Sequence, residues 1–270
     1  MPSTRPLAAI TGASAGIGAT FARTLAARGH DLILIARRAD RLQALASELA
    51  QRHGAKCEIV AADLNAAADL ERVAQHLGAL PDLAILINNA GYGVPGQFAK
   101  SEYAGQEGMH LLHVMATLRL THAVLAGMVA RGAGAIINVA SVAGFLTSPG
   151  AVSYGATKSW IIAFSEGIWM ELRGAGSAVR VQALCPGFTY SEFHDLTGDN
   201  REKLAPKSWW CTAERVVEDS LEGLDRDQPI VIPTLRYRLL VAIATRLPRA
   251  LRRRLTLGRA RTSGRMKAAK

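Results

Sequence analysis

TGASAGIG, at residues Thr11 to Gly18, follows directly on the apolar stretch Leu7–Thr11 and leads into a helical pattern. Its glycines stand at positions 12, 16 and 18, where a backbone without side chains can approach a ligand closely. The first turn of a helix presents free N–H groups and positive dipole, and both favour a phosphate. The spacing differs from the G-x-G-x-x-G dinucleotide fingerprint, and no Gly-Lys-Ser/Thr of a triphosphate loop follows. The stretch predicts a pyrophosphate-binding turn, with a merely tight turn as the alternative.

Short apolar runs alternate with amphipathic stretches along most of the chain. Seven runs are predicted as strands: Leu7–Thr11, Leu32–Ala36, Cys57–Ala61, Leu83–Asn88, Ala135–Ala140, Val179–Cys185 and Ile230–Ile232. The first six are continuously apolar, as strands covered on both faces should be. Helical patterns between them are Arg41–Arg52, Leu70–Leu77, His110–Ala130 and Ser153–Arg173. This alternation predicts an α/β fold, a single doubly wound Rossmann-type domain with a parallel sheet of about seven strands and helices on both faces.

The composition favours a single globular domain without a membrane span or disulfides. The chain has 270 residues, 49% of them hydrophobic, which suits one domain with a sizeable core. It holds no run of eighteen apolar residues and no secretory signal, so we expect neither a membrane span nor export. Three widely spaced cysteines, Cys57, Cys185 and Cys211, fit a reduced cytoplasmic protein without disulfides or a metal site. Twelve of the 32 Lys and Arg residues, and no Asp or Glu, follow Asp227, so the net charge of +10 belongs to the tail.

The second predicted strand ends at Ala36 and is followed by Arg37 and Arg38. An acidic residue at this point would accept hydrogen bonds from an adenosine ribose and favour NAD, whereas two arginines can hold a 2′-phosphate and favour NADP. One of them could instead stack on the adenine. The alternative is a solvated basic start to the next helix. With the glycine turn in place, NADP(H) is the predicted cofactor.

Ser141, Tyr154 and Lys158 form a second candidate site. Tyr154 and Lys158 lie four residues apart, about one helical turn, so phenol and ammonium can share one face. A nearby cation favours the phenolate and brings a hydroxyl with an ordinary pKa of about 10 closer to use as an acid or base. Ser141 follows the apolar run Ala135–Ala140, so its hydroxyl could reach a carbonyl oxygen held by the tyrosine. The alternative is a surface Tyr and Lys on an ordinary helix.

In their order along the chain, these motifs resemble the short-chain dehydrogenase/reductase family, of the NADP-preferring type, over roughly residues 6 to 232. The shared elements are TGASAGIG, Asp63-Leu64, NNAG at Asn88–Gly91, Ser141 after INVA, YGATK at Tyr154–Lys158, and Pro186-Gly187. The resemblance implies transfer of a hydride between a nicotinamide and a substrate carbon, with the protein supplying placement.

The resemblance also implies roles for single residues. The cofactor-binding positions would be Gly12, Ser14, Gly16, Ile17, Gly18, Arg37, Arg38, Asp63, Leu64, Asn89, Ala90, Gly91, Tyr154, Lys158, Pro186, Gly187 and Thr189. Tyr154 would exchange the proton at the substrate oxygen, and Ser141 would orient that oxygen. Lys158 would lower the pKa of the tyrosine and hold the nicotinamide ribose.

One position departs from the family pattern. Many members carry an asparagine in the long helix after NNAG that takes part in a proton path behind the lysine, but this chain has Leu112-His113-Val114 there. His113 could act as the relay itself, because imidazole both donates and accepts. It could be a packed helical histidine, or the relay could be damaged. A relay role predicts that protonation of His113 near neutral pH affects the rate.

The substrate loop is expected at residues 188–210, where Phe188, Tyr190, Phe193, Trp209 and Trp210 occur. These aromatics could cover a lipophilic ketone, aldehyde or secondary alcohol, or they could simply pack the loop onto the body. The leading hypothesis is an NADP-dependent carbonyl reductase or alcohol dehydrogenase. The alternative is a catalytically weak dinucleotide-binding regulatory or scaffold protein.

Residues 235–270 are predicted as a second unit, a basic amphipathic helix and a tail poorly ordered from Thr256, after a catalytic domain at residues 1–234. Leucines and arginines alternate at helical spacing across Leu235–Leu257, and Pro248 interrupts them. Such a helix could lie on an anionic membrane surface, pack on the domain or contact a second subunit, and specific nucleic-acid binding is not expected. The resemblance implies a homodimer or homotetramer, and the location is expected to be cytoplasmic, with possible membrane association.

Overall fold

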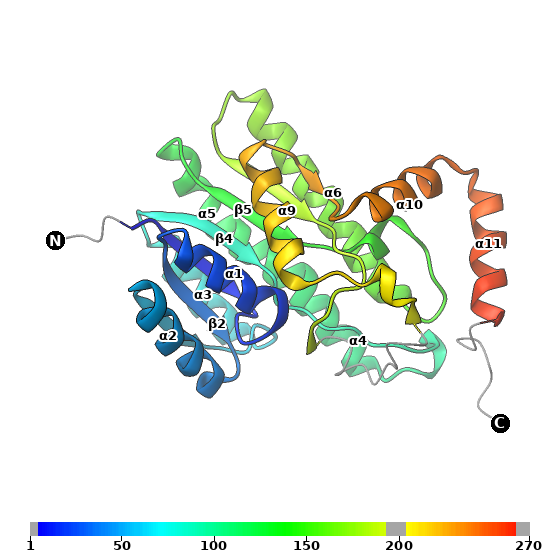
Figure 1. Cartoon of the computed structure of the whole chain (residues 1–270), viewed down its shortest axis with the longest axis horizontal. Helices are drawn as coiled ribbons and strands as arrows, with labels where there is room; N and C mark the ends of the chain where they lie inside the picture. The colour runs from blue at the N-terminus through cyan, green and yellow to red at the C-terminus, as the bar shows by residue number, and fades with distance from the viewer. Residues whose placement is uncertain (1–4, 193–203, 263–270) are drawn as a thin grey trace.

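The protein, described here by a computed structural model over residues 5–192 and 204–262, is built on a seven-stranded parallel sheet (Figure 1). The strands are β1 Leu7–Thr11, β2 Asp31–Ala36, β3 Cys57–Ala61, β4 Leu83–Asn88, β5 Ala135–Val139, β6 Arg180–Leu184 and β7 Ile230–Val231. They lie in the order β3-β2-β1-β4-β5-β6-β7. The predicted fold class is confirmed, and each predicted strand agrees with the structure to within one residue at either end.

Helices cover both faces of the sheet because both faces are apolar. One face carries α1 Gly16–Ala27, α2 Ala39–His53 and α9 Ala213–Asp225. The other carries α3 Ala67–Gly78, α5 Thr117–Ala130 and α6 Val152–Gly174. Phe21 of α1 and Val216 of α9 are fully buried on the first face, and Leu120 of α5 is buried on the second. Helix α9 is missing from the predicted helices, although its buried residues recur at helical spacing.

One helical stretch is continuous from Tyr103 to Ala130 and changes form in its middle. It begins as α4 Tyr103–His110, passes through a π-helical segment, η2 Leu111–Ala116, and continues as α5. Within residues 5–192 and 204–262, this is the one helix long and apolar enough to cross a membrane by length and composition. It packs along the sheet and against α3, as a core helix does.

The carboxyl ends of parallel strands share one edge of the sheet. The strand order reverses between β1 and β4, and ligands of doubly wound folds bind in the crevice at such a point. The glycine turn follows β1, NNAG spans the end of β4, Ser141 follows β5 and Pro186 follows β6. The fold therefore brings the predicted motifs to one edge.

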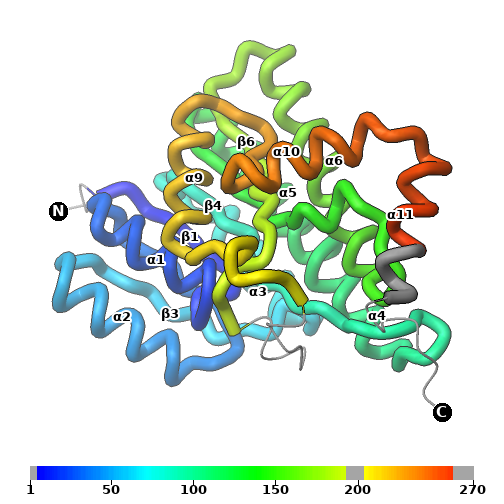
Figure 2. The backbone as a smooth tube through the Cα atoms, turned by 45° about the vertical axis from the view of Figure 1, so that its right-hand side comes forward, coloured from blue at the N-terminus to red at the C-terminus, as the bar shows by residue number. Residues whose placement is uncertain are grey.

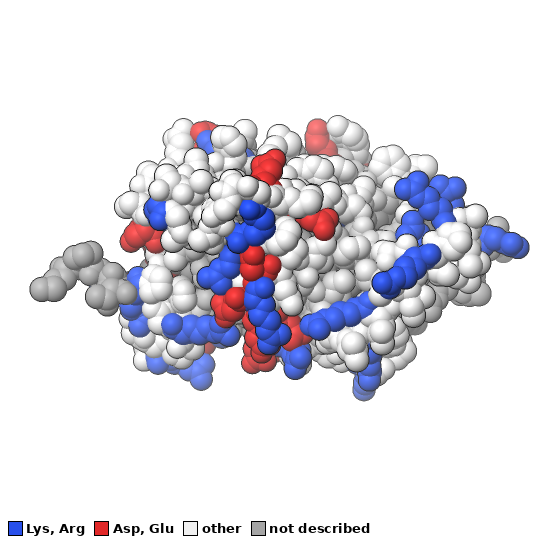
Figure 3. Space-filling view, turned by 90° about the horizontal axis from the view of Figure 1, so that it is seen from above, with Lys and Arg blue, Asp and Glu red and all other residues white. Residues whose placement is uncertain are grey.

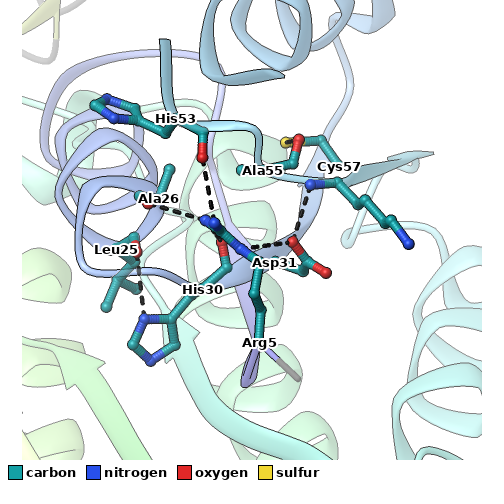
Figure 4. Close-up of polar contacts among 9 residues, drawn as sticks. Arg5, Leu25, Ala26, His30, Asp31, His53, Ala55 and Cys57 are labelled. Atoms are coloured by element: carbon teal, nitrogen blue, oxygen red, sulfur yellow. Dashed lines mark hydrogen bonds and ion pairs between the residues drawn. The ribbon is translucent and has the colours of Figure 1, made fainter. Parts of the chain in front are cut away.

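Arg5 connects several elements at the opposite edge of the sheet, where the parallel strands begin (Figure 4). Its guanidinium donates to the carbonyl oxygens of Ala26, His30 and His53 at 3.1, 3.1 and 3.2 Å, and pairs with Asp31 at 3.1 Å. These contacts join the ends of α1 and α2 to the start of β2.

Two helices come after the last strand, α10 Leu235–Arg246 and α11 Arg249–Thr262, and Pro248 separates them. They extend beyond the β7 end of the sheet (Figures 1 and 2). Helix α10 packs on the body through buried Tyr237 and Val241. Helix α11 continues to Thr262, past the start of the tail that is predicted to be poorly ordered from Thr256, and residues 263–270 lie outside the described chain.

Candidate active site

The glycine turn is tightly enclosed by the neighbouring strand end. Gly12 has a φ of 66°, and a Cβ on it would lie 2.8 Å from Asn89 Nδ2 and 2.9 Å from Ala90 Cα. A Cβ on Gly18 would overlap the carbonyl oxygen of Gly12, so helix α1 can approach the turn only with glycine there. The turn thus has the close backbone approach that a dinucleotide pyrophosphate requires at a helix N-terminus, and these residues fit such a group.

Thr11 and Asn89 hold this turn against the end of β4. The Thr11 hydroxyl accepts hydrogen bonds from the backbone N–H groups of Asn89 and Ala90 at 2.9 and 3.0 Å. The Asn89 side chain donates to the carbonyl oxygens of Thr11 and Gly12 at 2.9 and 3.3 Å. The side chain of Asn89 is therefore committed to shaping the turn, while Ala90 and Gly91 carry the chain past it.

Arg38 lies beside the turn and is hydrogen-bonded to it. Its guanidinium donates to Ser14 Oγ at 3.3 Å from Nε and at 3.0 Å from Nη2. It also pairs with Glu192 at 3.1 Å, and Arg41 pairs with the other oxygen of that carboxylate. The predicted pair of Ser14 and Arg38 is therefore brought together, with Glu192 bridging two arginines where a phosphate group would fit.

Other predicted cofactor positions have structural roles in this fold. Asp63 accepts a hydrogen bond from the Asn65 backbone at 3.1 Å, and Leu64 is buried beside it. Thr189 is buried, and its hydroxyl donates to Gly187 O at 3.1 Å. Ile17 packs at the margin of the core under the turn. All lie on loops at the carboxyl edge or, for Ile17, in the first turn of α1.

Ser141, Tyr154 and Lys158 come together at the ends of β5 and α6. Ser141 caps the short helix η3 Val142–Phe145, accepting from Ala143 N–H at 3.2 Å, and its hydroxyl donates to Pro186 O at 3.3 Å. Lys158 Nζ donates to Val139 O at 2.8 Å and lies 5.7 Å from the centre of the Tyr154 ring. The three predicted side chains therefore form one cluster on the predicted edge.

The pKa values of this cluster are set mainly by burial. Burial raises the pKa of Tyr154 to about 12, and a hydrogen bond with Ser141 opposes this shift. Burial lowers the pKa of Lys158 to about 7, partly offset by Cys185. The expected lowering of the tyrosine pKa by Lys158 stays a prediction, and burial raises the pKa of Tyr154 overall. Desolvation outweighs the attraction of a lysine that has itself lost much of its preference for charge.

His113 lies in the π-helical segment and is 1% exposed. Its Nε2 accepts a hydrogen bond from the Tyr92 backbone N–H at 3.2 Å, so Nδ1 carries the proton and faces Thr157 Oγ1 at 2.9 Å. The Thr157 hydroxyl in turn donates to Tyr154 O at 3.0 Å. A Cβ on Gly91 would lie 2.6 Å from the imidazole, so glycine there makes room for the ring.

Burial lowers the pKa of His113 well below 6.5, and the charge of Lys158 adds to this shift. A relay role would have His113 protonated near neutral pH; burial opposes that protonation, and both ring nitrogens already have protein partners. The geometry favours the packed histidine, which joins the loop after β4 to the helix that carries Tyr154.

Aromatic residues gather on the substrate side, next to Pro186. Trp210 lies between Phe188 and Tyr190, with ring centres 5.3 and 5.1 Å away. Tyr237 of α10 contacts Trp209 edge-on, at 5.4 Å between ring centres. Phe193 and the rest of residues 193–203 lie outside the described chain.

Four residues of this site were not predicted from the sequence: Thr11, Thr157, Glu192 and Tyr237. Thr157 stands inside the YGATK motif, yet its partner His113 is 44 residues away. Glu192 and Tyr237 meet their partners across separations of 154 and 49 residues. Spacing along the sequence therefore carries no signal for them.

Residues 6–202 match the family described as short chain dehydrogenase. The chain belongs to this family. Its structure resembles that of a short-chain dehydrogenase from Sphingobium yanoikuyae in complex with NADPH, with a TM-score of 0.80, 36% identity and coverage of 98% of both chains. It also resembles the bulky-bulky ketone specific alcohol dehydrogenase from Comamonas testosteroni, with a TM-score of 0.76, 32% identity and coverage of 98% and 96%.

Curated relatives include the very-long-chain 3-oxoacyl-CoA reductase of Anas platyrhynchos, which is 29% identical over 75% of this chain and 65% of its own length. The chain spans between 50% and 65% of the length of the first curated relatives that it matches. Likeness to those proteins is therefore likeness to a part of their length.

Proposed function

We propose that this protein is an NADP(H)-dependent oxidoreductase that interconverts a lipophilic carbonyl compound and its secondary alcohol. The observation that carries the proposal is the placement of Ser141, Tyr154 and Lys158 on the same sheet edge as the enclosed glycine turn. A proton-transfer group and a dinucleotide site at one crevice are the two parts that such a reaction needs.

The coenzyme would lie along the carboxyl edge. Gly12, Gly16 and Gly18 would accept its pyrophosphate, and Arg38 with Ser14 would hold the 2′-phosphate. Pro186 and Thr189, after β6, would border the nicotinamide. When bound, the coenzyme supplies the hydride. The absence of an acidic residue directly after β2 and the NADPH bound to the Sphingobium relative both support NADP(H) over NAD(H).

Tyr154 would act as the proton donor when a carbonyl substrate is reduced. A phenol whose pKa is raised to about 12 is protonated at pH 7 and is ready to donate to the substrate oxygen. Ser141 would hold that oxygen by hydrogen bonding while the carbonyl becomes an alcohol. Lys158, buried against Val139 O, would stabilise the resulting phenolate until it regains a proton.

The aromatic cluster of Phe188, Tyr190 and Trp210 supports a lipophilic substrate. It stands directly after the predicted nicotinamide-bordering residues, where a substrate would meet it. The ketone named for the Comamonas relative is bulky, and the substrate named for the Anas relative is a very long-chain acyl compound. Both support an apolar substrate of considerable size.

A second copy of the chain would pack on the outer faces of η2, α5 and α6. Large apolar side chains are exposed there, at Leu111, Met115, Leu118, Val129, Val152 and Met170. Burial of such a surface in a dimer is favourable. Sedimentation velocity would test this, and a monomer at micromolar concentration would contradict it.

Helices α10 and α11 would touch an anionic membrane surface. Lys and Arg gather at the end of the molecule that carries these helices (Figure 3). Exposed apolar residues stand among the arginines, at Leu235, Leu239, Ile243, Leu251, Leu255 and Leu257. This combination is typical of interfacial helices.

Turnover of NADPH with a panel of lipophilic ketones tests the proposed activity. Tyr154→Phe should lower kcat by about 10²- to 10⁴-fold, because it removes the proton donor, while NADPH binding changes little. Tyr103→Phe is the matched control, since this phenol is 74% exposed on α4 and should leave the rate unchanged. Full activity of the Tyr154 variant would contradict the mechanism. NADPH binding without turnover of any ketone would favour the regulatory alternative.

A further inference from the structure

Tyr237 is the one side chain in the described chain whose hydroxyl bonds both ends of the substrate loop. The hydroxyl accepts from Phe188 N–H at 3.0 Å and donates to Trp209 O at 2.8 Å. Its ring is 3% exposed and fills the space above Gly187, where a Cβ would overlap the ring atoms. An aromatic residue of the C-terminal helix is thus built into the nicotinamide-bordering segment.

Backbone hydrogen bonds join the same two loop ends beside this hydroxyl. Cys211 N–H donates to Phe188 O at 2.9 Å, and Tyr190 N–H donates to Cys211 O at 2.9 Å. Arg236, next to Tyr237, also donates to the Ser208 carbonyl oxygen. The N-terminal end of the loop, the C-terminal end of the loop and the start of α10 therefore meet at one point.

This junction is directly connected to the substrate-facing residues. Phe188 and Trp210 belong to the aromatic cluster. Tyr237 bonds the backbone of Phe188 directly and that of Trp209, the residue before Trp210. Two residues before Phe188, the carbonyl oxygen of Pro186 accepts from Ser141 Oγ at 3.3 Å and from Val142 N–H at 3.0 Å. A shift of the loop ends would move the aromatic cluster, whereas Ser141 keeps its own contact with Ala143.

We infer that Tyr237 is a positioning residue that determines substrate selectivity by fixing the aromatic cluster of Phe188, Tyr190 and Trp210. It would act through the two loop ends that its hydroxyl bonds. Loss of its hydroxyl leaves the Phe188 N–H and the Trp209 carbonyl without their shared partner, so the cluster loses its fixed place. Large ketones that contact the cluster bind less well, while the chemical step at Tyr154 proceeds as before. This inference rests on the proposed oxidoreductase function.

Tyr237→Phe in the full-length chain tests the inference, because it keeps the ring on Gly187 and removes only the hydroxyl. Val241→Ala is the matched control, since Val241 is also buried in α10 and its truncation weakens packing without touching the loop. Each variant is measured by amide hydrogen exchange of the peptides covering residues 186–190 and 207–211. KM and kcat are measured with propiophenone and with butanone.

The expected result is specific to Tyr237→Phe. Exchange of both peptides should rise about fivefold or more, and KM for propiophenone should rise by a similar factor, with kcat and the KM for butanone within about twofold of the wild type. Val241→Ala should lower the melting temperature without these changes. Unchanged KM for propiophenone, or equal effects of the two variants, would overturn the inference.

Failure of the proposed function gives a different pattern. A wild-type chain that oxidises NADPH with neither ketone would refute that function for these substrates. The exchange comparison alone would then decide whether Tyr237 fixes the loop ends, because it requires no turnover. Exchange of both peptides within about twofold of the wild type in Tyr237→Phe would overturn the inference in that case too.

Discussion

His113 stands where many family members carry an asparagine, and its buried ring links two parts of the site by hydrogen bonds. Its ring joins Tyr92 N–H to Thr157, and Thr157 bonds the backbone of Tyr154. The imidazole therefore supports the helix that carries Tyr154, the proposed proton donor. The π-helical turn around it widens the helix at this point, and such turns often occur at functional sites.

A pH-dependent stability results from this burial. The folded-state pKa of His113 lies well below 6.5, so the unfolded chain binds more protons once the pH falls under 6.5. The free energy of unfolding should therefore drop as the pH falls from 7.5 to 5. His113→Asn should remove up to about 2 kcal/mol of that drop, measured by urea unfolding at both pH values.

The control for this prediction is His122→Asn, because His122 is exposed on the same continuous helix. Its pH dependence of stability should match the wild type. If the wild type and His113→Asn lose the same stability between pH 7.5 and 5, then His113 is not held neutral by burial. The rate profile of the wild type should likewise show no inflection that disappears in His113→Asn.

At the scale of elements, ion pairs connect the start of the predicted substrate loop to the residues that follow β2. Glu192 pairs with Arg38 and Arg41, and these arginines, Arg41 foremost, lower the pKa of its carboxyl. A 2′-phosphate on Arg38 would compete with this carboxylate. The start of the predicted substrate loop and the arginine predicted to select the coenzyme are therefore joined by an ion pair.

Two substitutions separate these contributions. Glu192→Gln should strengthen NADPH binding about two- to fivefold, because an exposed competing ion pair is worth little, and should leave NADH binding unchanged. Arg38→Ala should weaken NADPH binding about tenfold or more and also spare NADH. Fluorescence titration with both coenzymes measures this. Equal effects on NADPH and NADH would remove Arg38 from 2′-phosphate recognition.

The strands and their ends could be predicted from the sequence because each is a short apolar run between polar turns. In a parallel fold this also predicts which motifs share an edge, so Ser141, Tyr154, Lys158 and the glycine turn could be placed together. The partners of His113, Glu192 and Tyr237 could not, since they depend on how loops and helices far apart in sequence pack. The raised pKa of Tyr154 could not be predicted from the sequence either, because it depends on how deeply the folded protein buries the phenol.

At the scale of the whole molecule, a nearly neutral catalytic body carries a basic end. Helix α10 belongs to both parts, because Tyr237 and Val241 are buried in the body while Leu239 and Ile243 are exposed. A truncation before α10 would damage the active-site junction. The membrane proposal therefore needs a chain that keeps α10 and lacks only the residues after this helix.

A chain ending at Leu247 is suited to this test. It loses α11 with its six arginines, Arg249, Arg252, Arg253, Arg254, Arg259 and Arg261, and an arginine near an anionic surface is worth on the order of 1 kcal/mol. Co-sedimentation with vesicles rich in phosphatidylglycerol should fall at least tenfold, with ketone reduction retained. Neutral phosphatidylcholine vesicles are the control, and equal partition of both chains would rule out the surface role of α11.

The junction at Tyr237 also has a consequence for protein engineering. Hydrogen bonds hold the two ends of the predicted substrate loop together. The stretch between Tyr190 and Trp209 can therefore be exchanged as a unit. Grafts of different length, taken from related dehydrogenases, would start and finish on the same anchored backbone. A library of such grafts would explore new substrate ranges and leave Ser141, Tyr154 and Lys158, the proposed proton-transfer residues, unchanged.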